Sequence, residues 1–111
     1  MTRDNLFYTD GLAKDEEYVE VIHRKENLYI EKIVSKGQKS PDGFIYDQET
    51  DEYVVLIQGR AVLDVEGNKV VLNSGESLFI PAHTKHRVES TSENPPCIWL
   101  CVHNIIKNSN I

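Results

Sequence analysis

Apolar and polar residues alternate along most of this chain in short segments, and Gly, Pro or Asn residues bound each segment. An alternation with a period of two is the pattern of a half-buried β-strand, and no window sustains the period of a helix. The pattern therefore predicts an all-β fold, a sandwich or barrel of antiparallel strands. The predicted strands span 18–24, 28–35, 51–58, the hairpin 60–72, 77–80, a strand starting near 85, and 97–104.

The hairpin 60–72 has the clearest predicted register. A two-residue turn at Gly67-Asn68 pairs Glu66 with Lys69, which adds an ion pair across the strands. The same register pairs Val65 with Val70 and Leu63 with Leu72. The residues expected on one face, as a wall of the core, are Ala61, Leu63, Val65, Val70 and Leu72.

Two polar side chains are predicted to point into the interior. His86 shares a strand face with Val88, and Glu52 shares a face with Val54 and Leu56. A carboxylate buried without a cation is costly, so Glu52 and His86 explain each other if both face one interior. They either pair directly or share a metal.

The last predicted strand is apolar on both faces. Trp99, Cys101 and His103 share one face, and the residues between them share the other. This pattern predicts burial on both sides, with one face in the barrel interior and the other in a subunit contact. Cys97 and Cys101 are too far apart along an extended strand to bridge each other and are expected to be buried thiols. His23, with no convergent polar neighbour, is expected at the surface or bonded to a single partner.

The stretches around these residues resemble the cupin family. Gly75, Pro81 and His86 follow the spacing of the second cupin motif, and Glu52 and Gly59 match the end of the first. The resemblance is closest to small single-domain bacterial cupins with Gly-Gln-x-Ser-Pro, Tyr-Asp-Gln and Pro-Ala-His-Thr-x-His-Arg-Val, which stand here at 37–41, 46–48 and 81–88. It covers nearly the whole chain and implies a double-stranded β-helix, an antiparallel jelly-roll barrel. By analogy with single-domain cupins, it also implies a homodimer.

The chain also departs from the cupin motifs. The first motif usually opens with two histidines one residue apart, and the corresponding place here reads Ile45-Tyr46-Asp47-Gln48. The two histidines are replaced either by Tyr46 and Gln48 or by Ile45 and Asp47. Both alternatives stay open, because the loop interrupts the alternation that would show which pair corresponds to the histidines. In the second motif His83 stands where glycine is usual, and Ser90 stands where asparagine is usual. These changes affect the expected metal site rather than the barrel.

Two functions are compatible with these residues. In the first, Glu52 and His86 bind a divalent metal (iron, manganese or zinc) with one or two further ligands, drawn from Asp47, Gln48, His83 and His103. Such a site fits an oxygenase or isomerase-type cupin that acts on or binds a small oxygenated molecule. In the second, the barrel binds a small molecule or sugar without metal or turnover, around a buried Glu52–His86 pair. Tyr46, Tyr53 and Trp99 are expected to line the ligand site in this case.

Length, charge and the absence of a long apolar run limit the number of domains, the possible partners and the expected location. The 111 residues are expected to form one domain, with an approach segment at 1–17 and a frayed tail at 105–111. Twelve Lys and Arg against 18 Asp and Glu give a net charge of −6, which disfavours nucleic acid and anionic membranes as partners. The longest apolar run, 98–102, is too short to span a bilayer, and the start lacks a stretch of signal-peptide length. The expected location is the cytoplasm.

Overall fold

The computed structural model describes residues 5–105, along which eight β-strands follow one another. Their bounds are β1 (Tyr18–Lys25), β2 (Leu28–Ser35), β3 (Thr50–Gln58), β4 (Arg60–Val65), β5 (Asn68–Asn73), β6 (Ser77–Ile80), β7 (His86–Thr91) and β8 (Cys97–Ile105). Within the described residues, no helix is long and apolar enough to cross a membrane. All regular elements among the described residues are strands, which confirms the all-β prediction.

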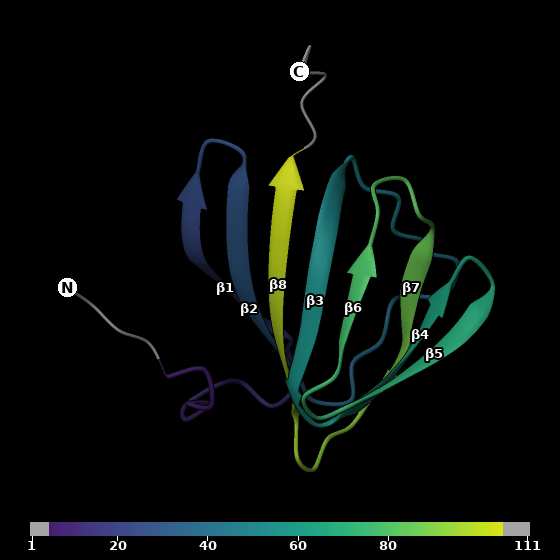
Figure 1. The fold of residues 1–111 in the computed structure, drawn as a ribbon. Helices are drawn as coiled ribbons and strands as arrows, with labels where there is room; N and C mark the ends of the chain where they lie inside the picture. Colours follow the sequence, from purple (N-terminus) through teal and green to yellow (C-terminus); the bar gives the residue numbers. More distant parts are fainter. Residues whose placement is uncertain (1–4, 106–111) are drawn as a thin grey trace.

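The strands form two antiparallel sheets that face each other (Figure 1). The larger sheet has the order β1-β2-β8-β3-β6, and the smaller has the order β5-β4-β7. Strands from distant parts of the sequence, such as β2 and β8, lie side by side, as the predicted jelly-roll barrel requires. In Figure 1 the two sheets converge at the lower end and separate toward the upper end.

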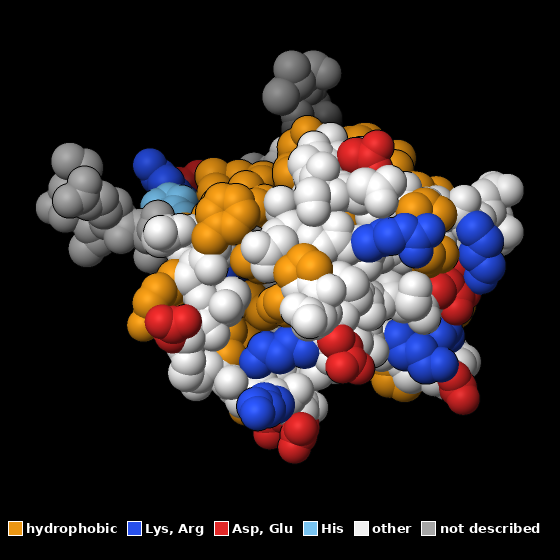
Figure 2. All heavy atoms as spheres, turned by 90° about the horizontal axis from the view of Figure 1, so that it is seen from below, with side chains coloured by type: hydrophobic (Ala, Val, Ile, Leu, Met, Phe, Trp, Pro, Cys, Tyr) orange, Lys and Arg blue, Asp and Glu red, His pale blue; other side chains and the backbone are white. Residues whose placement is uncertain are grey.

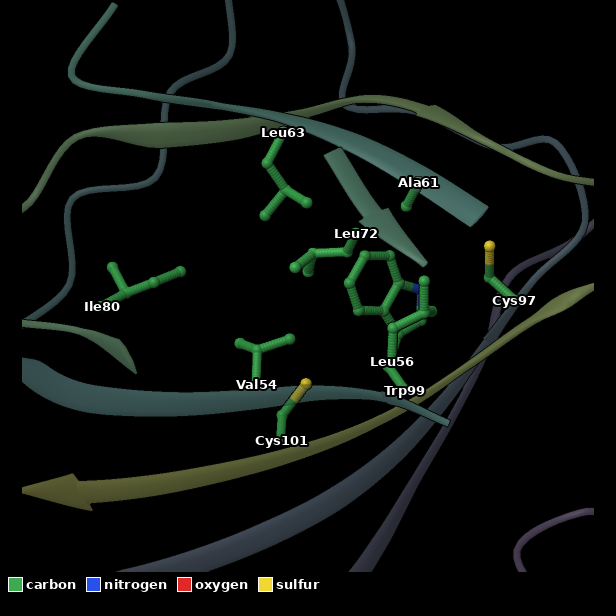
Figure 3. Packing of buried hydrophobic residues seen from close by; sticks show 9 residues of the cluster. All are labelled: Val54, Leu56, Ala61, Leu63, Leu72, Ile80, Cys97, Trp99 and Cys101. Atoms are coloured by element: carbon green, nitrogen blue, oxygen red, sulfur yellow. The ribbon is translucent and has the colours of Figure 1, made fainter. Parts of the chain in front are cut away.

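The hydrophobic core lies between the two sheets. Figure 3 shows Leu63 and Ala61 of the smaller sheet pointing toward Val54 and Trp99 of the larger one. The remaining members of this buried cluster are Leu56, Leu72, Ile80, Cys97 and Cys101. Cys97 and Cys101 are both free and buried, as predicted.

The first hairpin agrees with the sequence prediction. β1 and β2 are antiparallel, and Lys25 pairs with Leu28 around a turn in which Glu26 has a φ of 47°. His23 is exposed on β1, which confirms its predicted surface position.

The turn of the second hairpin lies one residue earlier than predicted. Its central residues are Glu66 and Gly67, with φ of 50° and 84°, so Val65 pairs with Asn68. A two-residue turn of this type needs positive φ at both central positions. Glu66 is held there because its backbone N–H donates to Lys85 O at 2.8 Å and its Oε1 accepts from Lys85 N at 3.1 Å.

This shift corrects the cross-strand pairs and leaves the faces unchanged. Leu63 faces Val70, and Ala61 faces Leu72. Lys69 lies opposite Asp64 and forms ion pairs with Asp64 at 3.3 Å and with Glu89 at 2.6 Å instead of with Glu66. Moving the turn by one residue changes which residues pair, but each side chain stays on its predicted face of the hairpin. The predicted core wall is therefore confirmed.

Both ends of the chain differ in detail from the expectation. β8 continues to Ile105, and the rest of the predicted tail lies outside the described residues. The segment before β1 lies against β2, where Lys32 Nζ donates to Tyr8 O at 2.7 Å and Lys36 Nζ donates to Ala13 O. On the face of the molecule seen from below, basic and acidic side chains are interspersed (Figure 2).

Candidate functional site

Strand register gives the inner face of the larger sheet a polar end and an apolar end. Near the end of β8, His103 pairs with Tyr29 on one side and with Glu52 on the other. Four residues earlier in β8, Trp99 pairs with Ile33 and Leu56. Side chains of alternate residues share a face, so the polar row and the apolar row both point inward.

A cavity of about 170 Å³ opens between the two sheets along these rows. Its apolar lining comes from both sheets and consists of Ile33, Val54, Leu63, Ile80, Val88 and Trp99, together with Pro41 and Cys101. Its polar lining consists of Glu17, Glu31, Ser35, Lys39, Ser40, Tyr46, Gln48, Glu52, His86 and His103. A cavity that combines apolar walls with convergent polar groups can hold a small molecule, and the polar share of this lining favours a polar one.

Glu52 lies between two imidazoles at the polar end. Its Oε1 is 3.7 Å from His86 Nε2, and its Oε2 is 3.7 Å from His103 Nε2. The three residues are 6–7% exposed. His103 Nε2 also donates a hydrogen bond of 3.0 Å to Glu31 Oε1. The predicted inward positions of Glu52 and His86 are therefore the observed ones, and His103 and Glu31 join them on the inner face.

Backbone contacts fix the orientation of His86. Its Nδ1–H donates to Thr84 O at 2.8 Å, so the neutral ring presents a lone pair at Nε2 toward Glu52. Tyr46 bridges to His86 through two backbone hydrogen bonds, and the two rings stack with centroids 5.2 Å apart. Gln48 Oε1 is buried and has no hydrogen-bond partner among residues 5–105. Tyr46 and Gln48 are thus the residues that face the cavity, while Ile45 is exposed.

Burial and charge shift the pKa values of this cluster. Burial raises the pKa of Glu52 more than the nearby His103 and His86 lower it. Burial lowers the pKa of His103, but the hydrogen bond to Glu31 and the charge of Glu52 outweigh this effect and raise it. For Glu31, burial raises the pKa, and the hydrogen bonds from His103 and from the Tyr29 hydroxyl lower it overall. Glu31 and His103 therefore behave as an ion pair, and burial makes the Glu52 carboxyl a weaker acid than an exposed one.

Three residues of the predicted site lie elsewhere. Asp47 and His83 are exposed and bond to each other, with Asp47 Oδ1 2.9 Å from His83 Nδ1. His83 has a φ of 61°, a conformation that favours glycine, which explains why glycine is usual at this motif position. Tyr53 points to the outer face of β3, because it alternates with the inward Glu52, and its hydroxyl donates to Ser77. We therefore correct the predicted set by removing Asp47 and His83 from the candidate ligands and Tyr53 from the cavity lining.

Sequence reasoning missed two carboxylates that line the cavity. Glu31 shares the inner face of β2 with Tyr29 and Ile33, so the alternation within 28–35 could have revealed it. Glu17 precedes β1 in a segment without periodicity, and no local pattern marks it.

The match to known families agrees with this architecture. The model of the cupin domain matches residues 32–103, which span β2 to β8 and include both imidazoles of the cavity. This chain belongs to the cupin family. The resemblance seen in the motifs is therefore confirmed, and the family carries no single reaction by itself.

Solved structures show the same barrel. A protein of Ralstonia eutropha JMP134, named a "putative mannose-6-phosphate isomerase", is 36% identical and has a TM-score of 0.89, with 96% of this cupin and 100% of that chain covered. A cupin superfamily protein of Desulfitobacterium hafniense DCB-2 is 17% identical over 86% of this chain and 83% of its own, with a TM-score of 0.74, which supports the fold alone.

A curated relative matches part of the chain. The tetracenomycin polyketide synthase protein TcmJ of Streptomyces glaucescens is 36% identical over 50 residues, which are 45% of this cupin. The match spans about a third of the length of that relative (34%).

Cupins commonly bind divalent metals, so the donors of this cavity need to be compared with that role. A two-histidine, one-carboxylate site needs a lone pair on both imidazoles. His86 Nε2 offers one, but His103 Nε2 uses its proton to bond Glu31. Within residues 5–105, no group of three or more His, Cys, Asp or Glu side chains is arranged to hold a metal ion. The residues of this cupin do not fit such a site as they are arranged.

Proposed function

We propose that this cupin binds a small molecule with hydroxyl or carbonyl oxygens in the barrel cavity and exchanges a proton with it through Glu52 and His86. One observation carries the proposal: the Glu52 carboxyl, whose pKa is raised by burial, lies 3.7 Å from the lone pair of His86 Nε2. A proton donor beside a proton acceptor is the arrangement that general acid–base chemistry needs. The unpaired Gln48 Oε1 would accept a hydrogen bond from a ligand hydroxyl.

An isomerisation next to a carbonyl group is the reaction class that suits this pair. It moves a proton from one carbon to the next, so one group removes a proton and the other delivers one. The name of the Ralstonia protein, an isomerase, belongs to the same class. We carry over the reaction class, isomerisation, to the present cupin, but not the phosphorylated substrate in the name of the Ralstonia protein.

Deuterium exchange tests the proposed proton transfer directly. The protein is incubated in D₂O with unphosphorylated aldoses and ketoses of four to six carbons, and NMR follows exchange at the carbon next to the carbonyl. We expect exchange with at least one sugar and a loss of about 10²-fold or more in Glu52→Gln and His86→Gln. His23→Gln, an exposed histidine on β1, is the matched control and keeps the activity. If no sugar exchanges and none raises the melting temperature, the proposal is wrong.

A divalent metal in the cavity is the second candidate. His86 Nε2 and Gln48 Oε1 favour it, because both line the cavity and offer lone pairs. The protein purified without a histidine tag or chelator would then contain near-stoichiometric iron, manganese or zinc. Alanine at His86, Glu52 or Gln48 would abolish loading, whereas His23→Ala would not.

We also propose that the protein forms a homodimer through the outer face of the larger sheet. Tyr53 and Phe79 pair across β3 and β6, and both are exposed on this face. Light scattering with size-exclusion chromatography gives the mass in solution. Tyr53→Lys with Phe79→Lys should convert a dimer to a monomer, and a wild type that is monomeric at tens of micromolar would contradict the proposal.

A further inference from the structure

The polar lining of the cavity is rich in hydrogen-bond acceptors. Gln48 Oε1 is unpaired within residues 5–105, and both oxygens of Glu52 are beyond hydrogen-bond distance of the neighbouring imidazoles. Three carboxylates line the cavity: Glu31 forms a close ion pair with His103 at 3.0 Å, Glu52 lies 3.7 Å from both His86 and His103, and Glu17 accepts from the Ser35 hydroxyl. A ligand that satisfies these acceptors must bring donors, such as hydroxyl or amino groups.

Glu17 is the one of these three carboxylates that lies outside the strands. The Ser35 hydroxyl donates to Glu17 Oε2 at 2.5 Å, and Ser35 Oγ in turn accepts from the Trp99 indole N–H at 3.1 Å. This chain of bonds fixes Glu17 beside a buried core residue. Burial raises the pKa of Tyr46, another lining residue, and the charges of Glu17 and Glu52 raise it further.

Positive charge is scarce at the same place. Lys39 is the one Lys or Arg among the described residues that line the cavity, and it is exposed. Arg87 does not line the cavity, and its guanidinium N–H groups are used by the backbone, where they donate to Ser40 O at 3.0 Å and to Pro41 O at 3.1 Å. A phosphate group carries only acceptors and negative charge at neutral pH, and among the described lining residues Lys39 is the one Lys or Arg that could complement it, against three carboxylates.

We propose that the ligand of this cavity is an unphosphorylated, donor-rich molecule such as a free polyol or sugar, and that Glu17 is the residue that excludes anionic analogues. This inference rests on the proposed binding function and adds the class of ligand. It separates this cupin from a sugar-phosphate enzyme despite the name of its Ralstonia relative. Glu17 acts by charge, so its effect is long-range and depends on salt.

Matched sugars test this selectivity. Each of several hexoses, mannose among them, is titrated in parallel with its 6-phosphate. Binding is followed by the fluorescence of Trp99, the one tryptophan of the chain, and by the melting temperature. We expect at least one hexose to bind about tenfold or more tightly than its 6-phosphate. Glu17→Gln keeps the acceptor for Ser35 and should raise the affinity for the 6-phosphate about tenfold, with little change for the hexose.

Glu16→Gln is the matched control, because Glu16 is adjacent to Glu17, is exposed as Glu17 is, carries the same charge, and does not line the cavity. Equal effects of the two variants, or a wild type that prefers the 6-phosphate, would overturn the role of Glu17 and leave ligand binding intact. If neither sugar of any pair binds, the proposed function fails, and this inference fails with it. Should Glu17→Gln not fold, raising the salt concentration on the wild type gives the same test, because screening should strengthen binding of the 6-phosphate alone.

Discussion

Replacing Glu31 with alanine tests the charged network around the cavity. Glu31 accepts hydrogen bonds from the Tyr29 hydroxyl at 2.8 Å and from His103 Nε2 at 3.0 Å. The side chains of Glu31 and His103 are both largely buried, so the alanine leaves the imidazole without its partner. Removing one partner of a buried ion pair costs about 3–5 kcal/mol. We expect about 3 kcal/mol, the lower end of this range, because Glu52 still lies 3.7 Å from His103.

The cost should depend on pH in a defined direction. The pKa of His103 is raised in the fold, so its contribution to stability is complete below the unfolded value of about 6.5 and is lost as the pH rises through the folded value. The pKa of Glu31 is lowered, so its contribution is lost only as the pH falls below its usual value of 4.5. Glu31→Ala should therefore cost more at about pH 6 than at about pH 8.5.

Guanidinium unfolding at these two pH values measures the change in the free energy of unfolding. In a thermal melt, a loss of about 3 kcal/mol corresponds to a fall of about 12 °C in Tm. Glu20→Ala is the matched control, because the Tyr18 hydroxyl donates to Glu20 at 3.0 Å with the same spacing and without a histidine. It should cost about 1 kcal/mol at both pH values. The reasoning is refuted if Glu31→Ala costs no more than Glu20→Ala, or if its cost is the same at both.

Three further substitutions test the packing around the site. Gly59 has a φ of +100°, and a Cβ there would lie 2.9 Å from Cys97 Cα, so Gly59→Ala should lower the free energy of unfolding by about 3 kcal/mol. Gly43→Ala is the control, because Gly43 has open space around it, and it should cost about 1 kcal/mol. Equal costs would contradict the close approach at Gly59. Ser35→Ala leaves the indole N–H of Trp99 without its acceptor and should cost about 1–3 kcal/mol and shift the tryptophan emission, whereas the exposed Ser77→Ala should do neither. Leu72→Ala should cost about 2–5 kcal/mol by denaturation, against less than about 1 kcal/mol for the exposed Val71→Ala, and the reverse order would place the wrong face of β5 in the core.

Alternation within single strands predicted the parts of the site that strands supply. Glu52 and His86 were each placed inward by an apolar neighbour two residues away, and both line the cavity. For His103 the strand is apolar on both faces, so alternation gave the residues that share its face but not which face is the interior. The turn Glu66-Gly67 was misplaced by one residue because its position depends on contacts with Lys85, which are distant in sequence. The faces survived this error, since a side chain's face depends on parity within its own strand.

Residues outside the strands could not be placed in the same way. Both alternatives for the missing motif histidines were open until backbone hydrogen bonds between Tyr46 and His86 showed which side chains face inward. Asp47 and His83 were natural candidates by residue type, yet they pair with each other at the surface. Glu17 had no pattern at all, and its position follows from a tertiary hydrogen bond to Ser35.

This division has a consequence for how the cavity can change. The strands supply Glu52, His86 and His103 together with the core, so altering these residues disturbs the proton-handling cluster or the barrel itself. Glu17 and Gln48 come from segments outside the strands, and both face the cavity. Substitutions at these two positions can alter the charge and hydrogen-bonding pattern offered to a ligand at little cost to the sheets. Ligand preference should therefore be separable from stability in this barrel, with variants of Glu17 and Gln48 changing affinity at nearly constant Tm.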